Sequence, residues 1–331
     1  MKLREFVKPR VVISKCIEFE NVRWDGQMIS SDFVKKLMPH VEFIPVCPEV
    51  EIGLGVPRYP IRIVLLNGEL RLIQPATNLD LTEKMRRFAY SFLDSLQEVD
   101  GFILKSRSPT SAIRDAKIYP STEKKVAPIS KGPGFFAATV LERFPHLAIE
   151  DEGRLRNPRI KEHFLKKLFT LASFREVKTS NSLGNLVRFH SENKLLFKAY
   201  DQKETRNLGG IVANQQKKAF DEMVIDYEQH LFKALRRAPR CGSTINVMMN
   251  AMGYFSDKLS KQEKSFFLDS LEKYRAGKLP LSVNTGILKS WIIRFKEDYL
   301  LNQTFFEPYP EELTDIDAMT VYCDGKDYWK Q

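Results

Sequence analysis

The sequence has few cysteines and no long apolar run. Only four cysteines occur among 331 residues, at positions 16, 47, 241 and 323, and no two of them form a CxxC pair. Their spacing defines no zinc site, and scattered cysteines of this kind are more often buried thiols, metal ligands or nucleophiles than disulfides. No apolar stretch approaches the roughly 18 residues of a membrane-spanning helix. The segment MKLREFVKPR has no apolar core, so we predict no signal peptide and a cytoplasmic protein.

A complete glycine-rich dinucleotide loop is also missing. Gly53 and Gly55 form a GxG without the third glycine of GxGxxG, and we therefore exclude a nicotinamide-binding site. The chain has no low-complexity tract and no internal repeat. What remains is the composition of a globular protein, with 43% apolar and 28% charged residues. The chain is longer than a domain with a single hydrophobic core usually is, and this length predicts two domains.

Charge is distributed unevenly along the chain. The formal net charge of +10 divides into +4 for residues 1–150, +11 for residues 151–300 and −5 for the remainder. A basic segment of this size is typical of a protein that binds a polyanion such as a nucleic acid. A well-solvated helical surface has the same composition, so charge alone leaves both interpretations open.

The first 150 residues alternate short apolar runs with amphipathic ones. Asn67-Gly68 between two such runs predicts a hairpin, and Asp80 with Glu83 predicts a capping-box start to a helix. Strands interleaved with helices predict an α/β domain with a mostly parallel sheet. The predicted strands are 11–14, 41–46, 101–105 and the hairpin 61–74; the predicted helices are 33–38, 80–99 and 135–143.

From Asn157 onward the apolar residues follow a helical period. Ser260 with Glu263 predicts a second capping box. The expected architecture is therefore an α/β domain (1–152), an all-α domain (153–315) and an acidic tail (316–331). The predicted helices are 158–177, 183–201, 206–238, 243–257, 261–275 and 284–297.

Two cysteines and a serine-rich loop follow predicted strands. Cys16 comes after the first strand, Cys47 ends the second, and KSRSPTSAIRD (105–115) follows the third. Ligands of open α/β sheets bind at the carboxyl ends of the strands, so these segments are expected to meet there. Two thiols at this edge could be metal ligands or a nucleophile and its partner. Two small buried apolar residues are the alternative.

Acidic residues surround the second of these cysteines. Glu49 and Glu51 place carboxylates close to Cys47, with Pro48 shaping the turn. Glu51 is a candidate proton donor or substrate-binding group. A surface charge or a helix cap remains the simpler interpretation of either acid.

These segments together resemble a known pair of domains. VVISKCIEFENVRWDG, VEFIPVCPEVEIGLGVPRYPIRIV and GFILKSRSPTSAIRDAKIY resemble the DUF523 domain. RLRNPRIKEHF, LVRFHSENKLLFKAY, NVMMNAMGYFSDKLSKQEK, YRAGKLPLSV and LLNQTFFEPYPEEL resemble DUF1722. The resemblance covers residues from about 10 to 315 in the usual order of the fused family.

The resemblance implies an activity and a cofactor. DUF523 proteins resemble thiouracil desulfidases, in which three cysteines hold a [4Fe-4S] cluster and its fourth iron takes the sulfur of a thiolated pyrimidine. Fusions with DUF1722 look like desulfidases of 4-thiouridine in tRNA, which makes the basic helical domain the expected tRNA-binding element. Cys16 and Cys47 match the first two cluster ligands. Glu51, Ser106 and Ser108 match the catalytic carboxylate and the serine-rich loop.

One position departs from the family pattern. The family loop reads approximately KSRSPSCG, and here Ser111 stands at the third cysteine and Ala112 at the glycine. Iron–sulfur clusters strongly prefer thiolates to hydroxyls. Ser111 or Asp115 could ligate through oxygen, or Cys323 could supply a thiolate. Otherwise the cluster is absent or labile and the protein binds RNA or thiolated bases without catalysis, or the chain is an altered form.

Other residues have expected supporting roles. Arg23, Trp24, Asp25, Glu49 and Arg107 are expected to order the site, with Trp24 as a stacking surface for a base. His190 and Cys241 are expected to be structural, although His190 could contact RNA. Two basic clusters are candidates for phosphate contact or, for the second, a helix cap. The candidate RNA-binding residues are Arg154, Arg156, Arg159, Lys161, Lys166, Lys167, Lys233, Arg236, Arg237 and Arg240.

Overall fold

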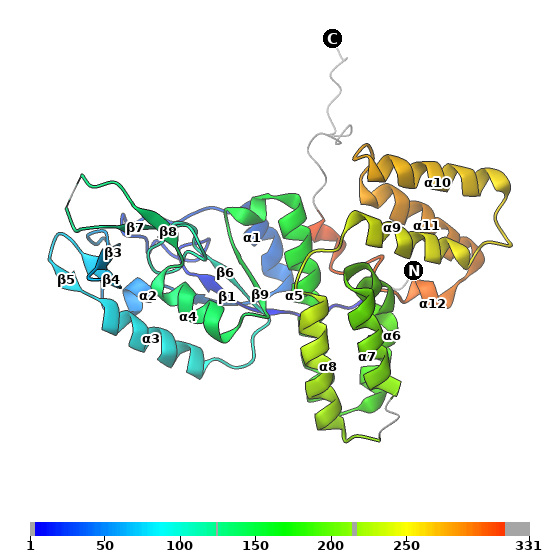
Figure 1. The fold of residues 1–331 in the computed structure, drawn as a ribbon, viewed down its shortest axis with the longest axis horizontal. Coiled ribbons are helices and arrows are strands. Elements are labelled where there is room, and N and C mark those ends of the chain that lie inside the picture. The colour runs from blue at the N-terminus through cyan, green and yellow to red at the C-terminus, as the bar shows by residue number, and fades with distance from the viewer. Residues whose placement is uncertain (1–3, 124, 214–216, 315–331) are drawn as a thin grey trace, which may run out of the picture.

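The computed structural model describes residues 4–123, 125–213 and 217–314. It has an α/β part, drawn on the left of Figure 1, and a helical part on the right, as the sequence predicts. Helix α5 (Pro158–Thr179) lies between them. Within the described residues, no helix combines the length and the apolar character needed to cross a membrane.

Four parallel strands form the central sheet, in the order β2-β1-β6-β9. Its strands are β1 (Arg10–Ser14), β2 (Glu42–Val46), β6 (Gly101–Leu104) and β9 (Ala148–Asp151). The first three confirm predicted strands, whereas β9 was not predicted. Its sequence AIED has only two apolar residues, so it gives no strand signal before its pairing with β6 is known.

Helices cover both faces of this sheet because its strands are apolar on both sides. Val12 and Phe102 pack against α3 (Thr82–Ser95) and α4 (Phe135–Arg143). Val11 and Ile13 pack against α1 (Asp32–Leu37) and against Phe164 and Leu168 of α5. Alternate residues of β1 therefore enter two different cores, as the two-residue period of a strand requires.

A second sheet of five strands lies beside the first, in the order β5-β4-β3-β7-β8. The predicted hairpin is confirmed, because Asn67 and Gly68 both have positive φ between β3 and β4. Only the β3–β7 pair is parallel. The strands are β3 (Arg62–Leu66), β4 (Glu69–Gln74), β5 (Leu79–Asp80), β7 (Ala116–Tyr119) and β8 (Ser130–Gly132).

The helix predicted at 80–99 is shorter than expected and lacks the predicted capping box. Asp80 is the last residue of β5, and Leu81 occupies the N-cap of α3. The Asp80 carboxylate still accepts a hydrogen bond from the Thr82 amide at 2.9 Å. Asp80, which the sequence pattern assigns to the helix, therefore belongs to β5 and pairs with β4.

The C-terminal half is helical as predicted, with one correction. The single helix predicted over 206–238 is two helices, α7 (Gln202–Ala213) and α8 (Phe220–Ala234). Leu208 and Tyr227 enter the same core, so the two helices pack against each other and do not continue as one helix. The Ser260–Glu263 capping box is confirmed at the start of α10. The remaining helices are α2 (Pro48–Glu51), α6 (Leu183–Tyr200), α9 (Cys241–Gly253), α10 (Lys261–Arg275), α11 (Leu281–Phe295) and α12 (Asp298–Leu301), with 3₁₀ turns at Met38–His40, Arg154–Arg156 and Glu311–Leu313.

Candidate functional site

The loops after the parallel strands meet at the carboxyl edge of the central sheet, as the sequence predicts. Cys16 follows β1, Cys47 follows β2 and the serine-rich loop follows β6. Hydrogen bonds hold the three loops together: the Lys15 amide donates to the Val46 carbonyl at 2.8 Å, and the Lys105 amide donates to the Ser14 side-chain hydroxyl at 3.0 Å. Strand pairing therefore fixes the relative positions of the two cysteines.

A cavity of about 430 Å³ opens at this edge. It is lined by side chains from all three loops and from the segment before β3. Most of the sequence-predicted site residues lie in this lining, so the structure brings them together. They are Cys16, Arg23, Trp24, Cys47, Glu49, Ser106, Arg107, Ser108 and Ser111.

Other predicted residues lie elsewhere. Glu51 is exposed at the end of α2 and is not part of the lining, whereas Glu49 is. The segment after Cys47 is a helical turn, and residues two apart on a helix point in different directions. Asp25 does not line the cavity, although it forms an ion pair at 3.1 Å with Arg23, which does. Asp115 accepts a hydrogen bond from the Arg107 amide at 2.7 Å and does not line the cavity.

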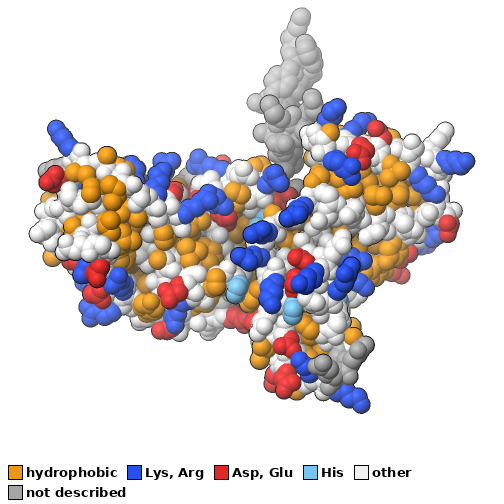
Figure 2. All heavy atoms as spheres, in the orientation of Figure 1, with side chains coloured by type: hydrophobic (Ala, Val, Ile, Leu, Met, Phe, Trp, Pro, Cys, Tyr) orange, Lys and Arg blue, Asp and Glu red, His pale blue; other side chains and the backbone are white. Residues whose placement is uncertain are grey.

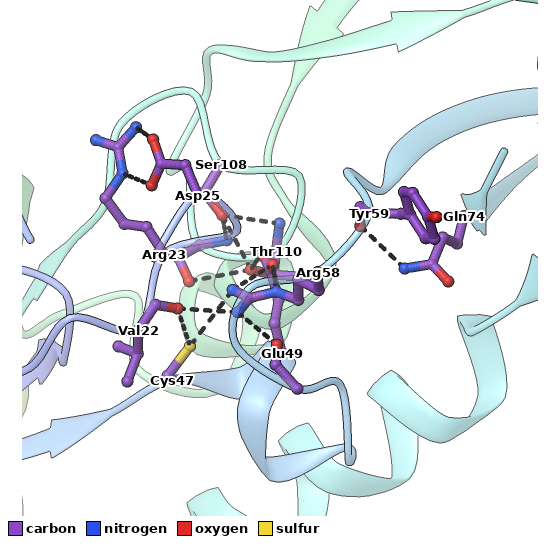
Figure 3. A network of polar contacts seen from close by, with 12 residues as sticks. Val22, Arg23, Asp25, Cys47, Glu49, Arg58, Tyr59, Gln74, Ser108 and Thr110 are labelled. Carbon is purple, nitrogen blue, oxygen red and sulfur yellow. Dashed lines mark hydrogen bonds and ion pairs between the residues drawn. The ribbon is translucent and has the colours of Figure 1, made fainter. Parts of the chain in front are cut away.

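Arg58 is a site residue that the sequence analysis missed. It reaches Glu49 with its Nη2 atom at 2.7 Å, and the two side chains are only 6% and 12% exposed. Arg58 also donates to the Val22 carbonyl at 2.9 Å and lies 3.9 Å from the Cys47 sulfur (Figure 3). An arginine nine residues after an acid carries no spacing signal, because an irregular loop sets their contact. The pair fixes the Glu49 carboxylate beside the thiol.

Hydroxyl groups connect that carboxylate to the serine-rich loop. Thr110, also missed, donates to Glu49 Oε1 at 3.1 Å. Its hydroxyl lies 2.9 Å from the Ser108 hydroxyl and 3.3 Å from that of Ser111. The Ser108 hydroxyl also accepts the Ser111 amide at 3.1 Å. Glu49 and the loop therefore form one polar network along the wall of the cavity (Figure 3).

Glu152 anchors the start of this loop. It follows β9, is 9% exposed, and accepts hydrogen bonds from the Ser106 amide at 2.8 Å and the Ser106 hydroxyl at 2.7 Å. Lys105 completes this anchor as its ion-pair partner. Sequence reasoning missed Glu152 because β9 was not predicted. A fourth parallel strand would have placed it at the same sheet edge.

The N-terminal end of helix α4 packs against the serine-rich loop. The amides of Phe135 and Ala137 donate to the carbonyls of Pro109 and Thr110 at 3.1 and 3.0 Å. Gly134, the N-cap of α4, touches the loop backbone so closely that an added Cβ would lie 2.4 Å from the Thr110 carbonyl carbon. This contact requires glycine at position 134.

Both cavity thiols are buried and hard to ionise. Burial, together with the neighbouring Cys47 thiol, raises the pKa of Cys16 to about 12. Burial also raises the pKa of Cys47, although Arg58 acts in the opposite direction. Without a bound metal ion both groups are neutral thiols near pH 7. A metal that bound them would have to displace their protons.

The donor set does not match the cluster that the family resemblance implies. Two thiols converge on the cavity, and the third position is the Ser111 hydroxyl, which is 3% exposed. Nowhere in the described ranges do three His, Cys, Asp or Glu side chains gather so that they could hold a metal ion. Cys323 lies outside the described residues. The described residues thus supply two of the three thiolates that a [4Fe-4S] cluster of this kind requires.

The candidate RNA-binding residues differ in exposure. Lys166 and Lys167 are 7% and 9% exposed, because one face of α5 packs on the sheet and the other on helices. Arg154 pairs with Glu150 at 2.6 Å, and Lys161 lies over the Phe33 ring. The remaining candidates are exposed: Arg156, Arg159, Lys233, Arg236, Arg237 and Arg240. Lysine and arginine side chains gather over the centre of the face in Figure 2, where α5, α7 and α9 come together.

Two segments of the chain match known protein families. The family described as 2-thiouracil desulfurase matches residues 11–152, and DUF1722, a family of unknown function, matches residues 194–310. The uncharacterized protein YbgA of Escherichia coli is 28% identical over 154 residues, which cover 46% of this chain and 91% of YbgA. The uncharacterized protein YbbK of Bacillus subtilis is 28% identical over 108 residues, covering 30% of this chain and 71% of YbbK.

Among solved structures, the [4Fe-4S]-dependent thiouracil desulfidase TudS is 27% identical with a TM-score of 0.37, covering 45% of this chain and 94% of TudS. The two family matches lie in the two halves of the chain, in the order that the sequence motifs predict. The chain therefore belongs to the family in which a 2-thiouracil desulfurase (DUF523) domain is fused to a DUF1722 domain.

Proposed function

We propose that this chain removes sulfur from a thiolated pyrimidine, either thiouracil or the 4-thiouridine base of tRNA. One observation carries the proposal: the segment that matches the 2-thiouracil desulfurase family forms a cavity in which Cys16, Cys47 and the buried Glu49–Arg58 pair meet the serine-rich loop.

The lining has the chemistry to recognise such a base. A pyrimidine presents alternating N–H donors and carbonyl acceptors, which the Glu49 carboxylate and the loop hydroxyls complement. The neutral, polarisable thiols of Cys16 and Cys47 are suited to contact a thiocarbonyl sulfur. Trp24 is 48% exposed at the cavity and offers a face on which a base can stack.

Removal of the sulfur is a hydrolysis. Water supplies the oxygen, the thiocarbonyl becomes a carbonyl, and the sulfur leaves as hydrogen sulfide, so the reaction needs no oxidant. A group must hold the water and accept its proton. We assign this role to Glu49 in place of Glu51, because Glu49 lines the cavity and is fixed by Arg58 and Thr110.

Ser111 supports a second candidate function. The described residues provide only two thiols at the cavity, because Ser111 stands at the third position. The second candidate is therefore that the protein binds thiolated pyrimidines without removing their sulfur. In that case the protein is a binding protein built on the desulfurase fold. The two candidates share the ligand and differ in the release of hydrogen sulfide.

For the tRNA substrate we propose a division of labour between residues 1–152 and 153–315. The first part binds the thiolated base, and the basic second part holds the tRNA body. The exposed arginines Arg236, Arg237 and Arg240, and the basic face in Figure 2, support this proposal. Cytoplasmic tRNA would be the accessible pool.

Ligand binding by the full chain tests the shared part of the proposal. We expect 4-thiouracil to bind more tightly than uracil, and Cys47→Ser to remove most of this preference. Cys241→Ser is the matched control, because Cys241 begins α9 and is not part of the cavity lining. Equal affinities for the two bases in the wild-type protein would refute both candidate functions. Binding without hydrogen sulfide release, after anaerobic reconstitution with iron and sulfide, would select the second candidate.

A further inference from the structure

A second cavity, of about 470 Å³, lies between α6, α7 and α9. Lys194 and Lys198 of α6 line it together with Arg206 of α7, and no acidic residue does. Within the described residues these three cations have no ion-pair partner. Lys194 and Lys198 are four residues apart on one helix face, where like charges destabilise the helix. Three unneutralised cations around one hollow indicate a site for an anionic group.

His190 adds an imidazole ring to the lining of this cavity. It is 8% exposed and lies one turn before Lys194, and its Nδ1 atom is 3.0 Å from the Tyr227 hydroxyl. Burial keeps the phenol protonated, because it raises the pKa of Tyr227 well above its usual value. Burial and Lys194 lower the pKa of His190 to about 4, so the imidazole is neutral at pH 7. The Tyr227 hydroxyl can donate to Nδ1, and in that tautomer the single ring proton is on Nε2.

The Nε2 atom is on the cavity side of the ring. A Cβ added at Gly209 would lie 3.5 Å from it, and Gly209 itself lines the cavity. In the part of the chain that the structure describes, Nε2 has no hydrogen-bond partner. Among those residues the only buried side-chain polar atom without a partner is Asn284 Nδ2, so Nε2 is not sealed off and a ligand or water in the cavity can reach it. Gly209 keeps the space in front of it open.

We propose that this cavity binds a backbone phosphate of RNA. The inference rests on the proposed function, which names tRNA as a substrate. Lysine, arginine and neutral side chains that can donate hydrogen bonds are the groups that contact nucleic-acid phosphates, and this cavity combines Lys194, Lys198 and Arg206 with the neutral imidazole of His190. Lysine and arginine side chains also gather over the centre of the face in Figure 2, and positive charge that extends beyond one cavity favours a polymer phosphate over an isolated small molecule.

Binding of an unmodified tRNA transcript tests this site without involving a thiolated base. For the double variant Lys198→Gln/Arg206→Gln we expect at least tenfold weaker binding at low salt. We also expect the slope of log K against log salt to fall by about 0.9 for each phosphate contact removed. Lys261→Gln/Lys278→Gln is the matched control, because it removes the same charge from exposed positions on and after α10. Wild-type affinity in the cavity variant, or an equal loss in the control, would overturn the proposal.

The variant Gly209→Leu tests the contribution of the open cavity apart from that of its positive charge. The added side chain covers the His190 Nε2 atom without altering any charge, so tRNA affinity should fall although the net charge is unchanged. Circular dichroism and urea unfolding establish that each variant is folded. If inorganic phosphate shifts the His190 imidazole signals in NMR spectra while the variants keep full tRNA affinity, the site takes small phosphates and the RNA assignment is refuted.

The same variants distinguish this inference from the proposed function. Each should bind free 4-thiouracil as the wild-type protein does, because the two cavities share no residue. Loss of tRNA binding in the cavity variants, with no thiouracil binding by any form, would sustain the phosphate site and refute the proposed function.

Discussion

Arg58 holds the carboxylate of the candidate site in place. For Arg58→Ala we expect a loss of about 3–5 kcal/mol in the free energy of unfolding, because Glu49 would keep a buried charge without its partner. Urea denaturation measures this loss. The exposed pair Arg86–Glu83 is the control, and Arg86→Ala should cost less than about 1 kcal/mol. Similar losses for the two variants would mean that the Arg58–Glu49 pair is not buried in solution.

Ser111 is the position at which this chain departs from a three-thiolate site. Ser111→Cys adds the missing thiol beside the same cavity, next to Thr110. After anaerobic reconstitution we expect bound iron and sulfide per chain to rise roughly tenfold or more, since even outer-shell partners change metal affinity by that factor. Iron analysis and the visible spectrum measure the change. Unchanged iron content would show that Ser111 does not stand at a ligand position.

At this scale the sequence predicts the cysteines and the serine-rich loop better than the acids. Cys16, Cys47 and the loop are identified because each directly follows an apolar strand. The choice between Glu49 and Glu51 depends on the direction of side chains in α2, a single helical turn with no periodic signal. Arg58 and Thr110 become site residues only through contacts between loops that are distant in sequence.

The contact between α4 and the serine-rich loop sets the shape of the cavity wall. For Gly134→Ala we expect a destabilisation of about 1–3 kcal/mol and weaker 4-thiouracil binding, because the new methyl group would overlap the Thr110 backbone. Gly242→Ala in α9 is the control. Nothing lies within 4 Å of a Cβ added at Gly242, and alanine has a higher helix propensity than glycine. A neutral Gly134→Ala would contradict the close approach of α4 to the loop.

A histidine of α5, His163, contacts α6 and is neutral in the folded protein. His163 lies 3.0 Å from the Tyr200 hydroxyl, and burial with Lys167 and Lys166 lowers its pKa to about 4, against the opposing effect of Glu162. The unfolded chain binds this proton near pH 6.5, so the stabilisation is complete above 6.5 and is lost as the pH falls towards 4.

His163→Gln should remove this dependence. Between pH 6.5 and about 5 the wild-type protein should lose about 1–2 kcal/mol more than the variant, from a limit of about 1.4 kcal/mol per pH unit and proton. Urea unfolding at each pH measures both proteins. Parallel stability curves over this range would mean that His163 titrates normally in the fold.

The elements themselves follow from sequence periodicity where they are long. Most predicted helices and strands are confirmed to within a few residues. The exceptions depend on tertiary contacts. Strand β9 is defined by its pairing with β6, α3 starts late because Asp80 pairs in β5 with β4, and α7 and α8 are separate helices that share one core. Local propensity contains none of these interactions.

Helix α5 connects the two halves of the molecule. It belongs to residues 153–193, which neither family match includes. Phe164 and Leu168 pack beneath the central sheet, and Phe174 packs among α6 and α8. The buried pair Arg175–Asp100, at 3.2 Å, ties its C-terminal part to the residue before β6. The sequence predicts a domain boundary near this helix, but not that the helix contributes to both cores.

Sulfur removal by the whole molecule tests the central claim most directly. The full chain, reconstituted anaerobically with iron and sulfide, is incubated with 4-thiouracil, and the hydrogen sulfide and uracil formed are measured together. We expect equal amounts of the two products from the wild-type protein and from Cys241→Ser, and at least tenfold less from Cys47→Ser and Glu49→Gln, because water replaces the sulfur within the cavity. Absence of both products from the wild-type protein, or equal rates in all four forms, would contradict the account.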